Sequence, residues 1–149
     1  YYIGIAYSRL QKDAEALAAL SRVAELVPNF PPVYFELGVV AQRTGEKDKA
    51  IQHYLRNAEL DPANADSLYN AGLILFGLGR IDEARGAFDK ALALRADDPD
   101  LLEMAARCAI NAGDFAQAIA YLEKALVGVK DPEKIQFLQD LLTTLREKK

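Results

Sequence analysis

The sequence has 149 residues, of which 51% are apolar and 27% charged, and its formal net charge is −4. This length fits one domain, and a chain rich in Ala and Leu with no Trp predicts a soluble all-α protein. The acidic balance argues against nucleic-acid binding, which needs concentrated positive charge. No apolar run reaches the roughly 18 residues of a membrane span, so we expect no direct membrane insertion. The single cysteine excludes an internal disulfide and leaves the compartment open, with the cytoplasm favoured.

A pattern with a fixed period of 34 residues runs through the chain. An alanine column shows the period most clearly, at Ala16, Ala50, Ala84 and Ala118. A column of small residues keeps the same step, at Gly4, Gly38, Gly72 and Ala106. A third column holds Gln11, Gly45, Gly79 and Gly113. We therefore expect four copies, at 1–30, 31–64, 65–98 and 99–131, followed by a capping helix at 132–149.

Each copy is expected to form two helices joined at the third column. The first copy begins at Tyr1 without a polar cap, so we expect more chain upstream. In the second copy one helical face before Gly45 carries Val33, Leu37, Val40 and Ala41, and one after it carries Ala50, Ile51, Tyr54 and Ala58. Glycine supplies the positive φ that ends a helix tightly. Small residues such as Gly38 and Gly72 are expected to let two helix backbones approach closely.

The later copies carry helix-start signals. Asp98-Pro99 and Asp131-Pro132 each predict an N-cap followed by proline at the first helical position. After Pro132 one apolar stripe remains, formed by Ile135, Leu138, Leu142 and Leu145. Polar residues take the positions that would contact a further helix, which predicts a cap with a hydrated outer face.

This pattern resembles the tetratricopeptide repeat (TPR) family, whose period is 34 residues. The second copy matches best, with Tyr34, Leu37-Gly38, Gly45, Ala50, Tyr54 and Pro62. Two departures stand out: Asn57 replaces a small residue, and Ala96 replaces the closing proline, which comes three residues late at Pro99. The resemblance implies a right-handed α-solenoid of antiparallel helix pairs.

The resemblance also implies a concave groove lined by the first helix of each copy, which binds a peptide or a helix. One column of this groove is nearly continuous and apolar, with Ile5, Val39, Leu73 and the capping-helix Leu141, interrupted by Arg107. We interpret it as an apolar partner site flanked by aromatics and edged by arginines. The alternative is that the aromatics pack within the repeats. The candidate groove residues are Ile5, Arg9, Phe35, Val39, Arg43, Tyr69, Asn70, Leu73, Phe76, Met104 and Arg107.

Some family members clamp the acidic C-terminus of heat-shock chaperones with Lys, Asn and Arg at fixed positions. In one frame those positions hold Tyr1, Ile5, Glu36, Asp66 and Asn70, and in the next frame Phe35, Val39, Asn70, Asp100 and Met104. Only Asn70 in the second frame fits, so we do not predict that function.

Nothing in the sequence predicts catalysis, a cofactor or a metal site. The acidic residues sit mostly at turns and outer helix positions, and His53 is the only histidine. Cys108 falls in an interior column and is expected in the core.

We therefore predict a non-enzymatic module that binds a protein or peptide partner. Two alternatives stay open: a self-assembling scaffold that uses the groove or the open N-terminal end, and a substrate-recruiting arm of a larger enzyme.

Overall fold

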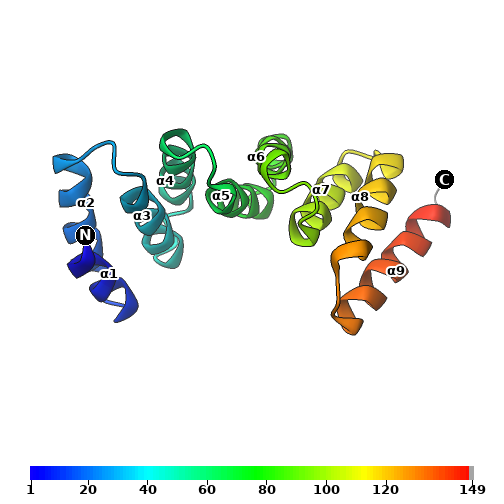
Figure 1. The fold of residues 1–149 in the computed structure, drawn as a ribbon, viewed down its shortest axis with the longest axis horizontal. Helices are drawn as coiled ribbons and strands as arrows, with labels where there is room; N and C mark the ends of the chain where they lie inside the picture. The colour runs from blue at the N-terminus through cyan, green and yellow to red at the C-terminus, as the bar shows by residue number, and fades with distance from the viewer. Residues whose placement is uncertain (148–149) are drawn as a thin grey trace. The chain divides into compact units, whose positions relative to one another are not determined.

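The computed structural model describes residues 1–147, and within them the chain forms only α-helices and their connections (Figure 1). The helices are α1 (Tyr2–Arg9), α2 (Asp13–Leu26), α3 (Pro31–Arg43), α4 (Lys47–Leu60), α5 (Ala65–Gly77), α6 (Ile81–Leu94), α7 (Pro99–Asn111), α8 (Phe115–Gly128) and α9 (Pro132–Glu147). The predicted all-α class is confirmed. Positions 148–149 of the expected capping helix lie outside the described residues.

The chain divides into two compact units, Tyr1–Ile74 and Leu75–Lys149, and the division falls inside α5. We call them unit 1 and unit 2. In unit 1, α2 packs on α1 and α3, and α3 packs on α4. In unit 2, α7 packs on α6 and α8, and α9 packs on α8. These consecutive helices therefore pack on each other, as expected of helix pairs in a repeat protein.

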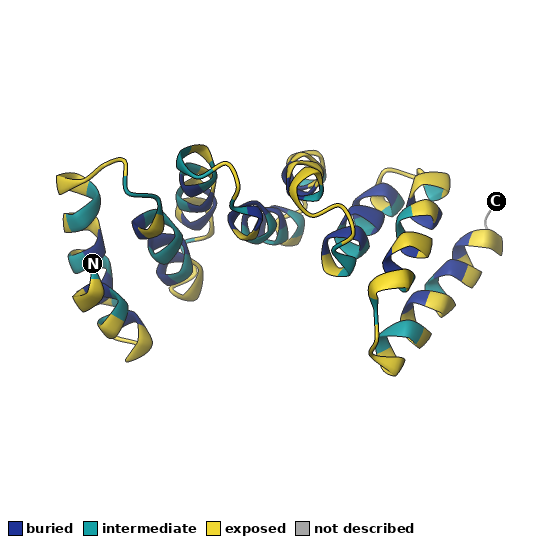
Figure 2. Ribbon diagram, viewed as in Figure 1, coloured by how far each residue is buried: buried dark blue, intermediate teal, exposed yellow. Residues whose placement is uncertain are grey.

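Each helix buries one side and exposes the other (Figure 2). The core between α2 and α3 is built from Ala16, Leu20, Val33, Leu37 and Val40. The core of α7, α8 and α9 includes Leu102, Ala106, Leu122, Leu138 and Leu142. Most of the apolar faces predicted for the second copy and for the capping helix are therefore buried, whereas Ala58 and Ile135 are only partly buried.

The turns inside the helix pairs follow one backbone design. Gly45, Gly79 and Gly113 have φ values of 81°, 75° and 76°, as predicted, and Gln11 has a φ of 57°. After each of them, the next backbone N–H donates to a carbonyl five residues back, as in Glu46 to Ala41 at 2.8 Å and Lys12 to Tyr7 at 2.9 Å. This is the Schellman closure of a helix C-terminus. Gln11 adopts it although it is not a glycine.

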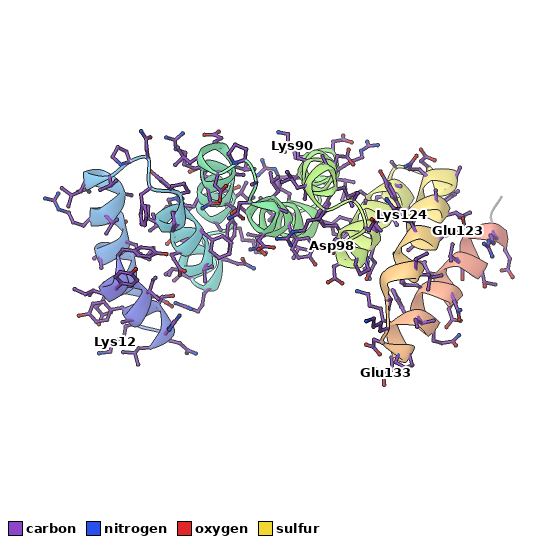
Figure 3. The ribbon with its side chains drawn as sticks, viewed as in Figure 1. Lys12, Lys90, Asp98, Glu123, Lys124 and Glu133 are labelled. Atoms are coloured by element: carbon purple, nitrogen blue, oxygen red, sulfur yellow. The ribbon has the colours of Figure 1, made fainter. Side chains whose placement is uncertain are left out.

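Between the pairs, the predicted caps are present. The Asp98 carboxylate accepts hydrogen bonds from the backbone N–H groups of Asp100 (3.0 Å) and Leu101 (3.2 Å) at the start of α7 (Figure 3). Asp131 accepts one from Glu133 at 3.1 Å. The connection 95–98 has the same length as 61–64. The late proline, Pro99, therefore starts α7 and does not lengthen the connection.

The glycines of the small-residue column pack against the partner helix. A Cβ atom on Gly38 would lie 2.8 Å from Cδ1 and Cε1 of Tyr54, and a Cβ atom on Gly4 would lie 2.7 Å from Cγ of Leu20. The space above each of these glycines is filled mainly by a large side chain of the partner helix. The backbone nitrogen of Leu20 would also lie 3.4 Å from a Cβ atom on Gly4, so the helix backbones pass close to each other there.

Candidate protein-interaction surface

The candidate groove residues divide between the two units. Unit 1 holds Ile5, Arg9, Phe35, Val39, Arg43, Tyr69, Asn70 and Leu73, and unit 2 holds Phe76, Met104 and Arg107. The apolar members are all partly buried, so each leaves some surface open to a partner. Their contact with a partner stays a prediction.

A cleft of about 280 Å³ opens in unit 1, and we call it the unit 1 cleft. Its apolar walls come from Tyr1 and from the first turns of α3, with Pro31, Pro32 and Phe35. Its polar lining consists of Glu36, Asn57, Asp61, Asn64 and Asp66. Of the candidate groove residues, only Phe35 lines this cleft.

The aromatic walls are fixed by edge-to-face packing. The ring centroid of Phe35 lies 5.6 Å from that of Tyr54, and the Tyr1 ring lies 5.1 Å from Phe30. Tyr54 is itself buried, with 1% of its surface exposed. These contacts hold the rings in place, so the apolar side of the cleft is already formed without a ligand.

The floor of the cleft contains a buried polar bridge that the sequence reasoning missed. Asn57 Nδ2 donates to the backbone carbonyl of Pro31 at 2.6 Å, and Ser67 Oγ donates to Asn57 Oδ1 at 2.8 Å. Asn57 and Ser67 are both essentially inaccessible. The bridge therefore ties α4 to the first turns of α3 and α5. The sequence did carry one signal for this bridge: Asn57 is polar in a column that otherwise holds the apolar residues Val23, Ala91 and Ala125.

The cleft is acidic. Glu36, Asp61 and Asp66 line it, and the lining includes no lysine or arginine. Burial raises the pKa of the Glu36 carboxyl, and the nearby Arg9 opposes that shift. Burial also raises the pKa of the Tyr1 phenol, and the Glu36 charge adds to this effect. The Glu36 carboxylate is thus partly stripped of water.

Two of the three arginines expected at the groove edge are engaged within the chain. Arg43 Nε donates to Asp13 Oδ1 at 2.8 Å, and Arg43 Nη2 donates to Ser8 Oγ at 3.1 Å and also contacts Asp13. Arg43 therefore links α3 to α1 and to the start of α2.

In unit 2, Arg107 has partners on its own helix and on the cap. Its Nη2 donates to Glu103 Oε1 at 2.8 Å, and its guanidinium lies 5.7 Å from the centre of the Phe137 ring. Lys134 of α9 lies 3.3 Å from the Glu103 carboxylate and also pairs with Asp100. A second contact of the capping helix joins Arg146 Nη2 to Glu123 of α8 at 2.6 Å. Glu123 is labelled in Figure 3. These charges attach α9 to the α7–α8 pair.

Two models described as tetratricopeptide repeat match residues 69–134 and 1–29, and a third, described as TPR repeat, matches residues 43–79. The chain belongs to the tetratricopeptide repeat family. An uncharacterised protein of Methanocaldococcus jannaschii is 36% identical over 61 residues, 41% of this TPR chain and 71% of that protein. The Hsp70-Hsp90 organizing protein of Triticum aestivum is 29% identical over 120 residues, and the match covers 70% of this chain but only 20% of that protein.

Solved TPR-type structures share the fold. A structure of MamA has a TM-score of 0.77 at 27% identity, with 87% of this chain and 72% of that chain covered. The type III secretion chaperone SycD of Yersinia enterocolitica, in complex with a peptide of the translocator YopD, has a TM-score of 0.71 at 18% identity and shows the fold alone. That match covers 77% of this chain and 91% of SycD.

The single cysteine and the single histidine of this TPR chain are packed against other residues of the fold. Cys108 is buried in α7, and burial raises the pKa of its thiol to about 11. His53 lies beside Tyr34, and burial is the main cause of its lowered pKa. Across residues 1–147, no three His, Cys, Asp or Glu side chains gather closely enough to hold a metal ion. None of the described helices is long and apolar enough to cross a membrane.

Proposed function

We propose that this chain is a non-catalytic protein–protein interaction module whose unit 1 binds a peptide or helix through the first helices of its pairs. The family and the relatives above support a role as a protein-interaction scaffold. The observation that carries the proposal is the preformed unit 1 cleft, in which Tyr1, Phe35 and Glu36 come together from α3 and the start of the chain. The partly exposed Ile5, Val39 and Leu73 extend the proposed binding surface along α1, α3 and α5. The same role for Phe76, Met104 and Arg107 in unit 2 stays a prediction.

The test is selection of binding peptides from a displayed random library, followed by Val39→Asp. A charge in the proposed surface should abolish peptide binding, while the helical circular-dichroism signal and the melting temperature stay near those of wild type. Leu55→Asp is the matched control, because Leu55 lies on α4 and is 37% exposed. Leu73→Asp, at a partly buried position of α5, provides a second variant if Val39→Asp unfolds. Peptides that bind all three variants as tightly as wild type would refute the proposed surface.

A second function, self-assembly, is favoured by one separate observation. Tyr2 and Ile3 on α1 and Leu10 directly after it are 82%, 68% and 67% exposed. One period later, Leu37 is 3% exposed because α2 covers it, and the equivalent Ala71 and Ala105 are 0% and 2% exposed. The exposed Ile3, whose three counterparts are buried, suits isologous pairing of two copies through this face.

Light scattering over a range of protein concentrations tests this second function. Wild type should form a concentration-dependent dimer, and Ile3→Asp should remain monomeric with an unchanged melting temperature. A wild-type chain that stays monomeric at the highest concentration would refute it.

A further inference from the structure

We propose that the unit 1 cleft binds an arginine side chain of a basic partner segment, which enters between the aromatic walls and the acidic lining. This inference rests on the proposed function and specifies the chemistry of its partner. It reverses the charge preference that an arginine-edged groove would have, since such a groove favours an acidic segment.

The charges that line the cleft favour a cation. Glu36 and Asp61 line the cleft, and none of the side chains that line it is basic. Arg43, which the sequence suggested as a basic edge, already donates its hydrogen bonds to Asp13 and Ser8. Arg9 is the cation that acts on Glu36, and it only partly offsets the cost of burying that carboxylate. An entering cation would therefore meet a local excess of negative charge.

The walls favour a guanidinium over an ammonium. A guanidinium is planar and weakly hydrated, so it stacks on aromatic faces and also forms paired hydrogen bonds with a carboxylate. Tyr1 and Phe35 supply aromatic surface on the same cleft that Glu36 lines. The chain already uses this pairing internally, with the Arg56 guanidinium 5.8 Å from the centre of the Tyr34 ring.

The floor makes the cleft rigid before a ligand arrives. Asn57 holds the carbonyl of Pro31 and the hydroxyl of Ser67, so α3, α4 and α5 are joined directly beneath the cleft. A preformed site loses little conformational entropy on binding, which favours recognition of one inserted side chain.

The direct test is titration of the intact chain with N-acetyl-arginine amide, monitored by backbone amide chemical shifts. N-acetyl-citrulline amide is the matched neutral probe, because it keeps the shape of arginine and removes its charge. We expect saturable shifts at the cleft-lining residues with the arginine probe, and binding weaker by about tenfold with the citrulline probe. Equal binding of the two probes, or arginine-induced shifts confined to other surfaces, would overturn the inference.

Substitutions test whether the arginine probe binds in the unit 1 cleft. Glu36→Gln keeps the size of the side chain and should weaken arginine-probe binding about fivefold, since one carboxylate contact is lost. Glu25→Gln is the control, because Glu25 lies on α2, is exposed and pairs with Arg22 at 2.9 Å. Raising the salt concentration should weaken binding of the arginine probe and leave the citrulline probe unchanged. If Glu36→Gln and Glu25→Gln behave alike, the cleft is not the binding site.

The displayed-peptide selection separates this inference from the proposed function. Enrichment of arginine in peptides whose binding depends on Val39 supports both the proposed function and the arginine inference. Peptides that depend on Val39 but contain no excess of basic residues, or contain an excess of acidic ones, overturn the arginine inference and leave the interaction surface standing. Enrichment of lysine equal to that of arginine would overturn the preference for a guanidinium. No peptide that depends on Val39 would refute the proposed function itself.

Discussion

Gly38→Ala should destabilise the protein, although alanine is the better helix former. A Cβ atom at Gly38 would lie 2.8 Å from Cδ1 and Cε1 and 3.0 Å from Cζ of Tyr54. The Tyr54 ring cannot move away easily, because it is buried, packs on Phe35 and donates its hydroxyl to Gln42 at 3.1 Å. Overpacking of this kind costs about 1–3 kcal/mol, while the gain in helix propensity is about 1 kcal/mol. The expected net loss in the free energy of unfolding is therefore up to about 2 kcal/mol.

Gly86→Ala is the matched control for this change. Gly86 lies within α6, is exposed, and has no atom within 4 Å of an added Cβ. Only the difference in helix propensity between glycine and alanine acts there, so this variant should gain about 1 kcal/mol in the free energy of unfolding. Urea unfolding followed by circular dichroism measures both variants, and hydrogen exchange in unit 1 and unit 2 assigns each change to its own unit. A Gly38→Ala variant as stable as Gly86→Ala would refute the packing argument.

A double variant tests whether the clash with the Tyr54 ring causes the loss of stability. Unit 2 already contains the substituted pair, since Ala106 and Leu122 are both fully buried in one core. The double variant Gly38→Ala with Tyr54→Leu should therefore lose less free energy of unfolding than the sum of the losses of the two single variants. Additive losses would mean that the Gly38 Cβ and the Tyr54 ring do not compete for the same space.

Three further predictions concern single positions. Gln11→Gly should raise the free energy of unfolding by about 0.5–1 kcal/mol in urea titrations, because Gln11 holds a φ of 57° that costs a side-chain-bearing residue more than glycine; an unchanged or lower value would contradict this. Asn57→Ala should lower the free energy of unfolding, measured in the same urea titrations, by about 2–3 kcal/mol, because the buried hydroxyl of Ser67 and the carbonyl of Pro31 lose their partner. Adding Ser67→Ala should recover part of that loss. Glu36→Gln should raise the melting temperature at pH 7 but not near pH 3: the pKa of Glu36 is raised in the folded state, so stability falls as pH rises from the ordinary carboxyl range through the folded pKa. A gain at pH 3 equal to that at pH 7 would show that burial of the charge is not the cause.

The helices and their ends could be predicted because their signals are local. The 34-residue period placed the glycines at the turn positions, and a positive φ is a requirement of the backbone at that point. Even Gln11 was placed correctly by its register, since the closure from Lys12 to Tyr7 uses backbone groups and does not depend on the side chain. The caps at Asp98 and Asp131 are likewise contained within a few residues of sequence.

The chemistry of the candidate site could not be predicted in the same way, because it depends on which distant side chains meet. Arg43 was assigned to the groove edge by its column, but its partner Asp13 lies 30 positions away in the sequence. A register argument gives the direction in which a side chain leaves its helix. It does not give the partner that a long flexible side chain reaches, and the partner decides whether the charge is available to a ligand.

Asn57 shows how a departure from the repeat can carry more information than a match. The column that holds Val23, Ala91 and Ala125 requires only a side chain small enough to pack. An amide there must find hydrogen-bond partners, because burying it without them costs about 1–3 kcal/mol. In this chain the partners are Pro31 and Ser67, and they fix the floor of the one cleft that Glu36 and Phe35 share. The residue that breaks the packing pattern is therefore the one that joins the fold of unit 1 to its proposed binding site.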